Sequence, residues 1–319
     1  MDYHGNNDGH CILEIYKKSI IDKRYNRKYK IKKMKQTLYV SDMDGTLLNS
    51  NSELSEATVK KLNELINKGA LFTVATARTP ATVVELMRDV NANLPFIVMA
   101  GCAQWDNRKK EYISARIINK SDIGKLVEIF NKHGNNPFVY YKHENQILVH
   151  HVNELTDEEK AFIEPRVKTP LKSLIKCDKL DADATEDDAM LIFSMGRFNT
   201  LRCIANDIDK AGINCTYNCY HDIFNTEEGF IDIYVKGTTK AAAIKELAHE
   251  VDAKRIVVFG DNLNDIPMMK VADWSIAVNN AFSEVKDCAN EVIGCNNEDA
   301  VVKWIEKDFG MSTDSIEQI

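Results

Sequence analysis

The sequence predicts an α/β protein whose parallel sheet is interrupted by an inserted α+β segment. Between Leu38 and Gly101, short apolar runs alternate with amphipathic stretches of helical period. This alternation is typical of β-α-β units, which form parallel sheets with right-handed crossovers. The same alternation returns from Lys240 onward, whereas the segment between has a different rhythm of strands and helices. We therefore expect a core that is built from two separate parts of the chain.

The first part carries the signals of three strands, two helices and a hairpin. Apolar runs predict strands at 38–40, 71–76 and 96–100. Ser55 can cap a helix that ends at Lys68, before Gly69, and Thr79-Pro80 opens the next helix. The stretch 105–113 has polar residues at its centre and predicts a hairpin.

The middle part reads as a helix followed by two strands, roughly repeated. The pattern predicts helices near 122–133 and 200–211, and strands near 138–142, 146–151, 191–195, 215–220 and 223–225. Such a repeat favours an antiparallel sheet with helices on one face. The last part predicts a helix at 241–251, strands near 257, 275–278 and 291–293, and a final helix that holds Val301, Val302, Trp304 and Ile305. We expect an N-terminal extension at 1–35, a core at 36–115 and 233–319, and an inserted domain at 116–232.

Composition limits the classes of function. The chain of 319 residues is long enough for two domains, and its net charge of −7 argues against nucleic-acid binding. No apolar run approaches the ~20 residues of a membrane span, so we expect no membrane partner. The eight cysteines include no Cys-x-x-Cys pair, and we expect reduced thiols in a cytoplasmic protein.

The basic segment 17–35 is interpreted as a tail or as a stretch before a true start at Met34, although an RNA-binding or membrane-binding arm is an alternative. For the oligomeric state we expect a monomer or a weak homodimer.

Acidic residues follow two of the predicted strands. Asp42 and Asp44 precede Gly45 after the first strand, and Asp261 and Asp265 follow the apolar run 255–259. Ligands of open α/β sheets bind at the carboxyl ends of the strands, so these side chains could converge. Like charges this close favour a cation such as Mg2+, which prefers carboxylates and phosphate oxygens. The alternative for Asp42 and Asp44 is an ordinary surface turn.

Two further residues join this set. Thr76 ends the second predicted strand, and Lys240 opens the helix after 237–239. Their alternatives are a half-buried strand-end threonine and a solvated lysine, and Asp265 could be a plain helix cap. Arg78 and Arg88 can each be read as a substrate contact or as part of a structural ion pair. Lys142, His143, Arg197 and Asn199 of the inserted segment can each be read as a specificity residue or as an ordinary surface residue.

These motifs resemble those of the haloacid-dehalogenase superfamily of phosphatases, and more closely its Cof-like branch of sugar-phosphate phosphatases. The likeness covers roughly residue 36 to the end and is closest around Asp42 and from Lys240 to Ala281, where the stretch 258–268 is particularly specific. It implies a Rossmann-like core with an inserted α/β cap. The chain departs from the family pattern at Ala77, where the family commonly has Gly. It departs again at Ala100-Gly101-Cys102, where Asn-Gly-Ala is frequent.

The resemblance also implies roles for the motif residues. Asp42 would be the nucleophile that forms an aspartyl-phosphate, and Asp44 the general acid and then base. Mg2+ would be held by the Asp42 side chain, the Asp44 backbone carbonyl and Asp261, with Asp265 anchoring metal waters or Lys240. The phosphate would be contacted by a further set of residues: Gly45, Thr46, Thr76, Ala77, Lys240 and Asn264.

The function predicted from these residues is Mg2+-dependent hydrolysis of small phosphate monoesters, in particular sugar phosphates. One alternative is a phosphotransferase or phosphomutase, since related mutases share the motifs and a similar cap. Another is a non-catalytic sugar-phosphate-binding protein. The intact Asp42, Asp44, Lys240 and Asp261 argue against the latter.

Overall fold

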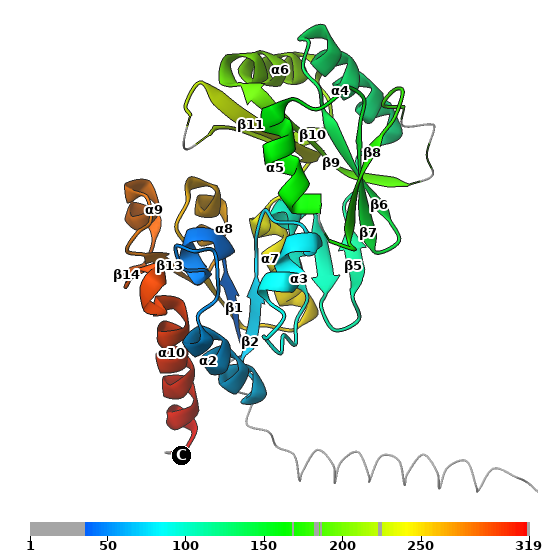
Figure 1. Cartoon of the computed structure of the whole chain (residues 1–319). Coiled ribbons are helices and arrows are strands. Elements are labelled where there is room, and N and C mark those ends of the chain that lie inside the picture. The colour runs from blue at the N-terminus through cyan, green and yellow to red at the C-terminus, as the bar shows by residue number, and fades with distance from the viewer. Residues whose placement is uncertain (1–35, 168, 182–184, 186, 223–224, 318–319) are drawn as a thin grey trace, which may run out of the picture.

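The computed structural model describes residues 36–317, apart from 168, 182–184, 186 and 223–224, with side chains up to Gly310. Figure 1 shows two packed parts, a lower one that contains both ends of this range and an upper one formed by its middle. The extension predicted at 1–35 lies outside the described residues. Within the described part of the chain, no helix combines the length and apolar character that a membrane crossing needs.

The lower part is built on a five-stranded sheet in the order β14-β13-β12-β1-β2. All neighbouring strands are parallel, as the alternating pattern predicts. Every residue of β1 is buried, because a parallel sheet is covered on both faces. The strands are β1 (Thr37–Ser41), β2 (Leu71–Val74), β12 (Arg255–Gly260), β13 (Trp274–Val278) and β14 (Glu291–Ile293).

A small antiparallel sheet continues the core next to β2. Its strands are β3 (Phe96–Val98), β4 (Ala103–Asp106) and β5 (Glu111–Ala115). The predicted hairpin is thus confirmed. The third predicted parallel strand meets β2 through a single parallel bridge, between Ala75 and Ile97. It then turns away through a short helical segment, η2 (Met99–Gly101).

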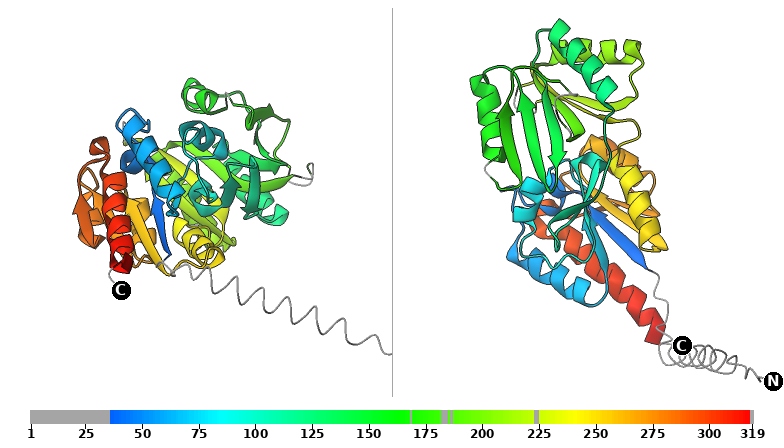
Figure 2. Two further views of the ribbon diagram at one scale, coloured as in Figure 1. Left: turned by 90° about the horizontal axis from the view of Figure 1, so that it is seen from below. Right: turned by 90° about the vertical axis from the view of Figure 1, so that its right-hand side faces the viewer.

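Helices pack on both sides of the core sheet. The right-hand view of Figure 2 shows α2 and α10 on one side of the strands and α7 on the other. Ser55 caps α2 as predicted, since its side chain accepts a hydrogen bond from the N–H of Thr58. The helices are α2 (Glu56–Asn67), α3 (Pro80–Leu86), α7 (Lys240–Glu250), α8 (Ile266–Met269), α9 (Ser283–Cys288) and α10 (Ala300–Glu317). Short helical turns are η1 (Met43–Leu47), η4 (Leu263–Asp265) and η5 (Asn296–Glu298).

The upper part is a six-stranded sheet in the order β10-β11-β9-β6-β7-β8. Its strand pairs are antiparallel except for β7 and β8, which are parallel. The strands are β6 (Phe138–His143), β7 (Gln146–His151), β8 (Lys172–Lys176), β9 (Asp188–Arg197), β10 (Cys215–His221) and β11 (Glu228–Val235). Three helices accompany them: α4 (Lys120–Lys132), α5 (Asp157–Val167) and α6 (Phe198–Ala211).

The two predicted helices, α4 and α6, lie on one face of this sheet as expected, whereas α5, which was not predicted, lies on the other. Residues of α4 and α6 pack with Val139 and Ile192 in one apolar cluster, on one face of the sheet. Ile163 of α5 packs with Tyr140 in the other cluster, which continues into the lower part. Neighbouring strand residues point to opposite faces. Therefore α5 lies on the opposite face from α4 and α6, toward the core, where it contacts α3 (Figure 1).

Two elements of the upper part carry no signal in the sequence pattern. The helix α5 has no apolar stripe and contains Pro165, and β8 begins and ends with lysine. The strand predicted at 223–225 falls mostly outside the described residues, and the strand that follows is β11. The predicted division at 232/233 falls inside β11, which pairs with β9 and runs to Val235.

Candidate active site

Two acidic residues follow neighbouring strands at the same edge of the core sheet. β1 and β12 pair in parallel, with Ser41 opposite Phe259, so both strands end at the same height. The N–H of Asp42 donates to the carbonyl of Phe259 at 2.9 Å, which fixes where the chain leaves β1. Carboxylate oxygens of Asp42, Asp261 and Asp265 lie within 4.8 Å of one another. The expected convergence of the two strand ends therefore occurs.

Lys240 brings a positive charge into this cluster from the first turn of α7. Thr239 caps that helix by accepting from the N–H of Ala242 at 3.0 Å. The Lys240 ammonium donates to Asp42 Oδ1 at 2.5 Å and to Asp265 Oδ1 at 2.8 Å. All three side chains are buried. Lys240 is therefore part of a buried ion-pair network, and the solvated alternative is excluded.

Asp265 shapes the loop after β12. Its Oδ2 accepts from the N–H groups of Asp261 and Asn262 at 3.1 and 3.2 Å, while Oδ1 accepts from Lys240. A side chain at position 260 would collide with Asp265, which explains the glycine there. Asp265 thus caps the turn η4 and also holds Lys240, so both sequence interpretations of this residue apply.

The turn after β1 is fitted against Asp261. Thr46 Oγ1 donates to Asp261 Oδ1 at 2.8 Å. Gly45 has a φ of +74°, and a β-carbon there would overlap the Asp261 carboxylate. Asn280, which follows β13, donates through Nδ2 to the Gly45 carbonyl at 2.7 Å. Sequence reasoning missed Asn280, although an amide just past another strand end was an available signal.

The charges of the cluster are not balanced. Burial raises the pKa of Asp42 to about 8 and that of Asp261 to about 6. Burial would lower the pKa of Lys240, but the charges of Asp265 and Asp42 raise it above its ordinary value. One ammonium thus faces three carboxylates. Further positive charge at this point would stabilise the ionised carboxylates.

The carboxylate of Asp44 has a different partner from that of Asp42. It is exposed and accepts two hydrogen bonds from the Arg78 guanidinium, from Nε at 2.7 Å and from Nη2 at 2.5 Å. The Asp44 carboxylate lies outside the cluster of three that the described side chains form. Arg78 therefore makes an ion pair at the mouth of the site. Arg88 instead pairs with Glu85 and Asp89 on the exposed surface, which favours its structural interpretation.

Three predicted residues have no described side-chain contact with the carboxylate cluster. Thr76 is buried just past β2, and its Oγ1 accepts from the N–H of Arg78 at 3.1 Å. Ala77 is exposed beside it, and Asn264 is exposed on η4 next to Asp265. Their phosphate-binding roles stay predictions.

Comparison with known proteins agrees with this geometry. The family described as haloacid dehalogenase-like hydrolase matches residues 39–305, most of the chain. The chain belongs to the haloacid dehalogenase-like hydrolases. This membership confirms the resemblance read from the motifs and makes the protein a hydrolase, and its phosphatase relatives support phosphoric monoester hydrolysis.

Three proteins similar to this hydrolase are matched over nearly their whole lengths. A 5-amino-6-(5-phospho-D-ribitylamino)uracil phosphatase of Bacillus subtilis (strain 168) is 26% identical over 271 residues, covering 84% of this chain and 94% of the relative. A haloacid dehalogenase-like hydrolase structure from Bacteroides thetaiotaomicron aligns with a TM-score of 0.69 at 20% identity, covering 86% and 99%. The subclass IIB sugar phosphatase BT4131 aligns with a TM-score of 0.67 at 21% identity, covering 86% and 99%. The structural likenesses confirm the predicted fold, a parallel-sheet core with a cap.

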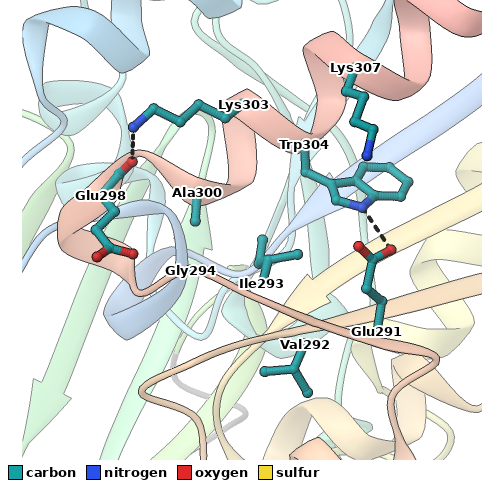
Figure 3. Close-up of a pocket in the computed structure, with 9 residues that line it drawn as sticks. All are labelled: Glu291, Val292, Ile293, Gly294, Glu298, Ala300, Lys303, Trp304 and Lys307. Atoms are coloured by element: carbon teal, nitrogen blue, oxygen red, sulfur yellow. Dashed lines mark hydrogen bonds between the residues drawn. The ribbon is translucent and has the colours of Figure 1, made fainter.

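A pocket of about 580 Å³ elsewhere on this hydrolase is not the active site. Figure 3 shows it between β14 and the start of α10. Glu291 on its wall accepts from the indole N–H of Trp304 at 2.9 Å. None of the predicted site residues lines this pocket.

Proposed function

We propose that this hydrolase is a Mg2+-dependent phosphatase of small phosphate monoesters, sugar phosphates among them, and that it works through an aspartyl-phosphate on Asp42. The observation that carries the proposal is the buried network in which Lys240 joins Asp42 to Asp265, beside Asp261. Phosphoryl transfer depends mainly on positioning and on neutralising the charge of the phosphoryl oxygens, and these residues supply both.

The acidic cluster fits a divalent cation. Its carboxylate oxygens lie within 4.8 Å of one another, and one lysine does not balance their charge. Asp42 and Asp261 would hold Mg2+ through their side chains and Asp44 through its backbone carbonyl. Both Asp265 oxygens already accept hydrogen bonds, so Asp265 would support the site from behind. Mg2+ would supply charge neutralisation for the bound phosphate.

The chain's own residues would divide the reaction into two steps. In the first, an Asp42 oxygen attacks phosphorus while Asp44 gives a proton to the departing oxygen. In the second, Asp44 takes a proton from the water that hydrolyses the aspartyl-phosphate. Asp44 must leave its ion pair with Arg78 to do so, and an arriving phosphate offers Arg78 another anion.

Other residues would bind the phosphoryl oxygens. Lys240 would neutralise developing charge, and the hydroxyl of Thr76 would donate a hydrogen bond. The backbone amides of Gly45 and Thr46 form a turn suited to an anion. Ala77 and Asn264 complete the predicted set at the rim of the site.

The upper part of the molecule would act as a cap that selects small substrates. A lid over the sheet edge excludes water and blocks a folded protein chain. The named substrate of the Bacillus subtilis relative is itself a small phosphate monoester, which supports this class of substrate. The cytoplasmic location and the state of monomer or weak homodimer stay predictions.

The proposal is tested by phosphate release from several dozen phosphorylated metabolites with Mg2+. We expect turnover of some of them, and loss of that turnover in Asp42→Asn with the fold retained by circular dichroism. Undiminished hydrolysis by Asp42→Asn would show that the nucleophile is another residue. Phosphate transfer between sugars without release would favour the mutase, and tight binding without any reaction would favour the binding protein.

A further inference from the structure

One face of the cap sheet carries charged and aromatic side chains toward the core. Lys172 on β8 and Tyr140 on β6 belong to the face shared with α5, as do Tyr220 and Asp232 on β10 and β11. We call these four residues and Arg166 of α5 the inner cap face. Strand alternation places α4 and α6 on the other face of the sheet.

Lys172 is a buried basic residue without an acidic partner, and an anion beside it would favour its charged form. It is only 3% exposed, and its ammonium lies 4.4 Å from the centre of the Tyr140 ring. Among the described residues, no carboxylate is within ion-pair distance of it. A cation over an aromatic ring recovers part of the lost hydration, but a buried charge normally has a counter-ion.

Arg166 is a second cation that makes no ion pair within the described structure, and it lies nearer the active site. Its guanidinium stacks 3.8 Å from the centre of the Phe162 ring and donates to the Phe162 carbonyl at 2.6 Å. Burial and the nearby charge of Arg78 lower the pKa of Arg166, while Asp44 acts in the opposite direction. Arg78 and Asp44, which pair at the mouth of the active site, therefore both act on the charge of Arg166. The helix α5, which carries Arg166, also contacts α3.

The acid on this face does not neutralise the two cations. Asp232 accepts a hydrogen bond from the Tyr220 hydroxyl at 3.2 Å, and it has no ion pair with Lys172 or Arg166. The inner cap face therefore has more basic than acidic groups. Its five residues combine aromatic rings, two basic groups and one hydrogen-bonding carboxylate.

We propose that Arg166 and Lys172 bind a second anionic group on the leaving part of the substrate. The preferred substrates are then phosphate monoesters that carry another acid group, either a carboxylate or a second phosphate. Arg166 meets that group first at the rim, and Lys172 receives it deeper in the cap. This inference rests on the proposed function, because it assigns the part of the substrate that Asp42 does not attack.

The test compares substrates that differ in the second acid group. One pair is 3-phosphoglycerate and glycerol 3-phosphate, and the other is glucose 1,6-bisphosphate and glucose 6-phosphate. We expect kcat/KM to favour the acidic member of at least one pair by about tenfold or more, and which pair does so distinguishes carboxylate from phosphate. Lys172→Met and Arg166→Gln should each remove most of that preference while changing kcat/KM of the neutral member by less than about threefold.

Matched controls separate binding from folding. Arg202→Gln removes an exposed arginine from α6, on the other face of the sheet, and should leave the preference unchanged. Lys172→Met keeps the apolar stem over Tyr140, and thermal unfolding shows whether the cap remains folded.

The outcomes distinguish this inference from the proposed function. Hydrolysis of both members of each pair at equal efficiency would overturn the second-anion site and leave the phosphatase intact. If none of these four substrates is hydrolysed, calorimetric titration of Asp42→Asn with the same pairs still decides the inference, and the proposed function fails only if the wider metabolite panel also gives no turnover. A preference in Kd for the acidic member that disappears with Lys172→Met supports the site, and equal Kd values refute it.

Discussion

The Lys240 ammonium lies between two carboxylates that come from distant parts of the chain, at 2.5 Å from Asp42 Oδ1 and 2.8 Å from Asp265 Oδ1. The contact joins the turn after β1, the turn after β12 and the start of α7 at one point. A buried ion pair is tolerated only when both charges are present, because either one alone is left without water and without a partner. This relationship makes Lys240 important both for folding and for the proposed chemistry.

Replacing Lys240 by Met should therefore affect stability and turnover together. The loss of the ammonium leaves Asp42 and Asp265 buried without a cation, and we expect the free energy of unfolding to fall by about 3 kcal/mol. Turnover should fall at least ~100-fold, because the charge on the phosphoryl oxygens is no longer balanced. Urea unfolding and phosphate release measure the two effects.

The control is Lys245→Met, at an exposed position on the same helix, which should change stability and turnover little. A stable and active Lys240→Met protein would remove this lysine from the mechanism.

Mg2+ should stabilise the protein through the same cluster. At a concentration of 100 times Kd, a ligand that binds only the folded state contributes about 2.7 kcal/mol, so the unfolding temperature should rise with Mg2+. Asp261→Asn keeps the acceptor for Thr46 but loses the charge, so this rise should largely disappear. Burial raises the pKa of Asp261 to about 6, so at pH 7.5 the group is ionised in both states, but its charge is less favourable in the fold than in the unfolded chain. Without Mg2+, Asp261→Asn should therefore be at least as stable as the wild type.

The control for Asp261→Asn is the same substitution at a carboxylate outside the cluster of Asp42, Asp261 and Asp265. Asp89→Asn, at an exposed ion pair with Arg88, should show the full Mg2+ effect. An Asp261→Asn protein that Mg2+ stabilises as much as the wild type would place the ion elsewhere.

The sequence was sufficient to predict those parts of the fold and of the site that follow a strong local pattern. Asp42 and Asp261 follow apolar runs, and a parallel sheet necessarily brings such strand ends to one edge. The side-chain direction of Asp44 was not predictable, since its bidentate pairing with Arg78 depends on how two loops meet in space. The contacts of Lys240 likewise required the placement of α7 against α8 and η2.

The cap was less predictable for a physical reason. Helix α5 is stabilised by its packing against β8 and α3 and has no apolar stripe of its own. Lys172 lies in a short edge strand that begins and ends with lysine, a pattern typical of exposed edges. Nothing local indicates that this lysine is buried, so the inner cap face follows only from tertiary structure.

Gly45 should resist substitution for a reason beyond backbone conformation. Gly45→Ala and Gly237→Ala both place a β-carbon on a backbone of positive φ, which costs about 1 kcal/mol in each case. At position 45 the β-carbon also overlaps the Asp261 carboxylate, whereas nothing lies within 4 Å at position 237. We expect Gly45→Ala to lose the Mg2+-dependent rise in unfolding temperature and most turnover, while Gly237→Ala loses a little stability only. Equal behaviour of the two variants would show that the Asp261 side chain moves aside at little cost.

The buried charge of Lys172 should make stability depend on pH. Burial, with a smaller effect of the Arg166 charge, lowers the pKa of Lys172 from 10.5 to about 7. Between pH 7 and 10 the unfolded chain therefore holds a proton at this residue that the folded chain has released, so stability rises with pH across that range. Each pKa unit corresponds to about 1.4 kcal/mol. The Lys172→Met variant has no such proton, so its free energy of unfolding should not show this pH dependence. The variant should therefore be more stable than the wild type by the largest margin below pH 7 and by the smallest near pH 10.

Urea unfolding at pH 6.5, 8 and 9.5 measures the difference in stability, with Lys236→Met as an exposed control. A difference that stays constant over this range would mean that Lys172 remains protonated in the fold, with an anion beside it.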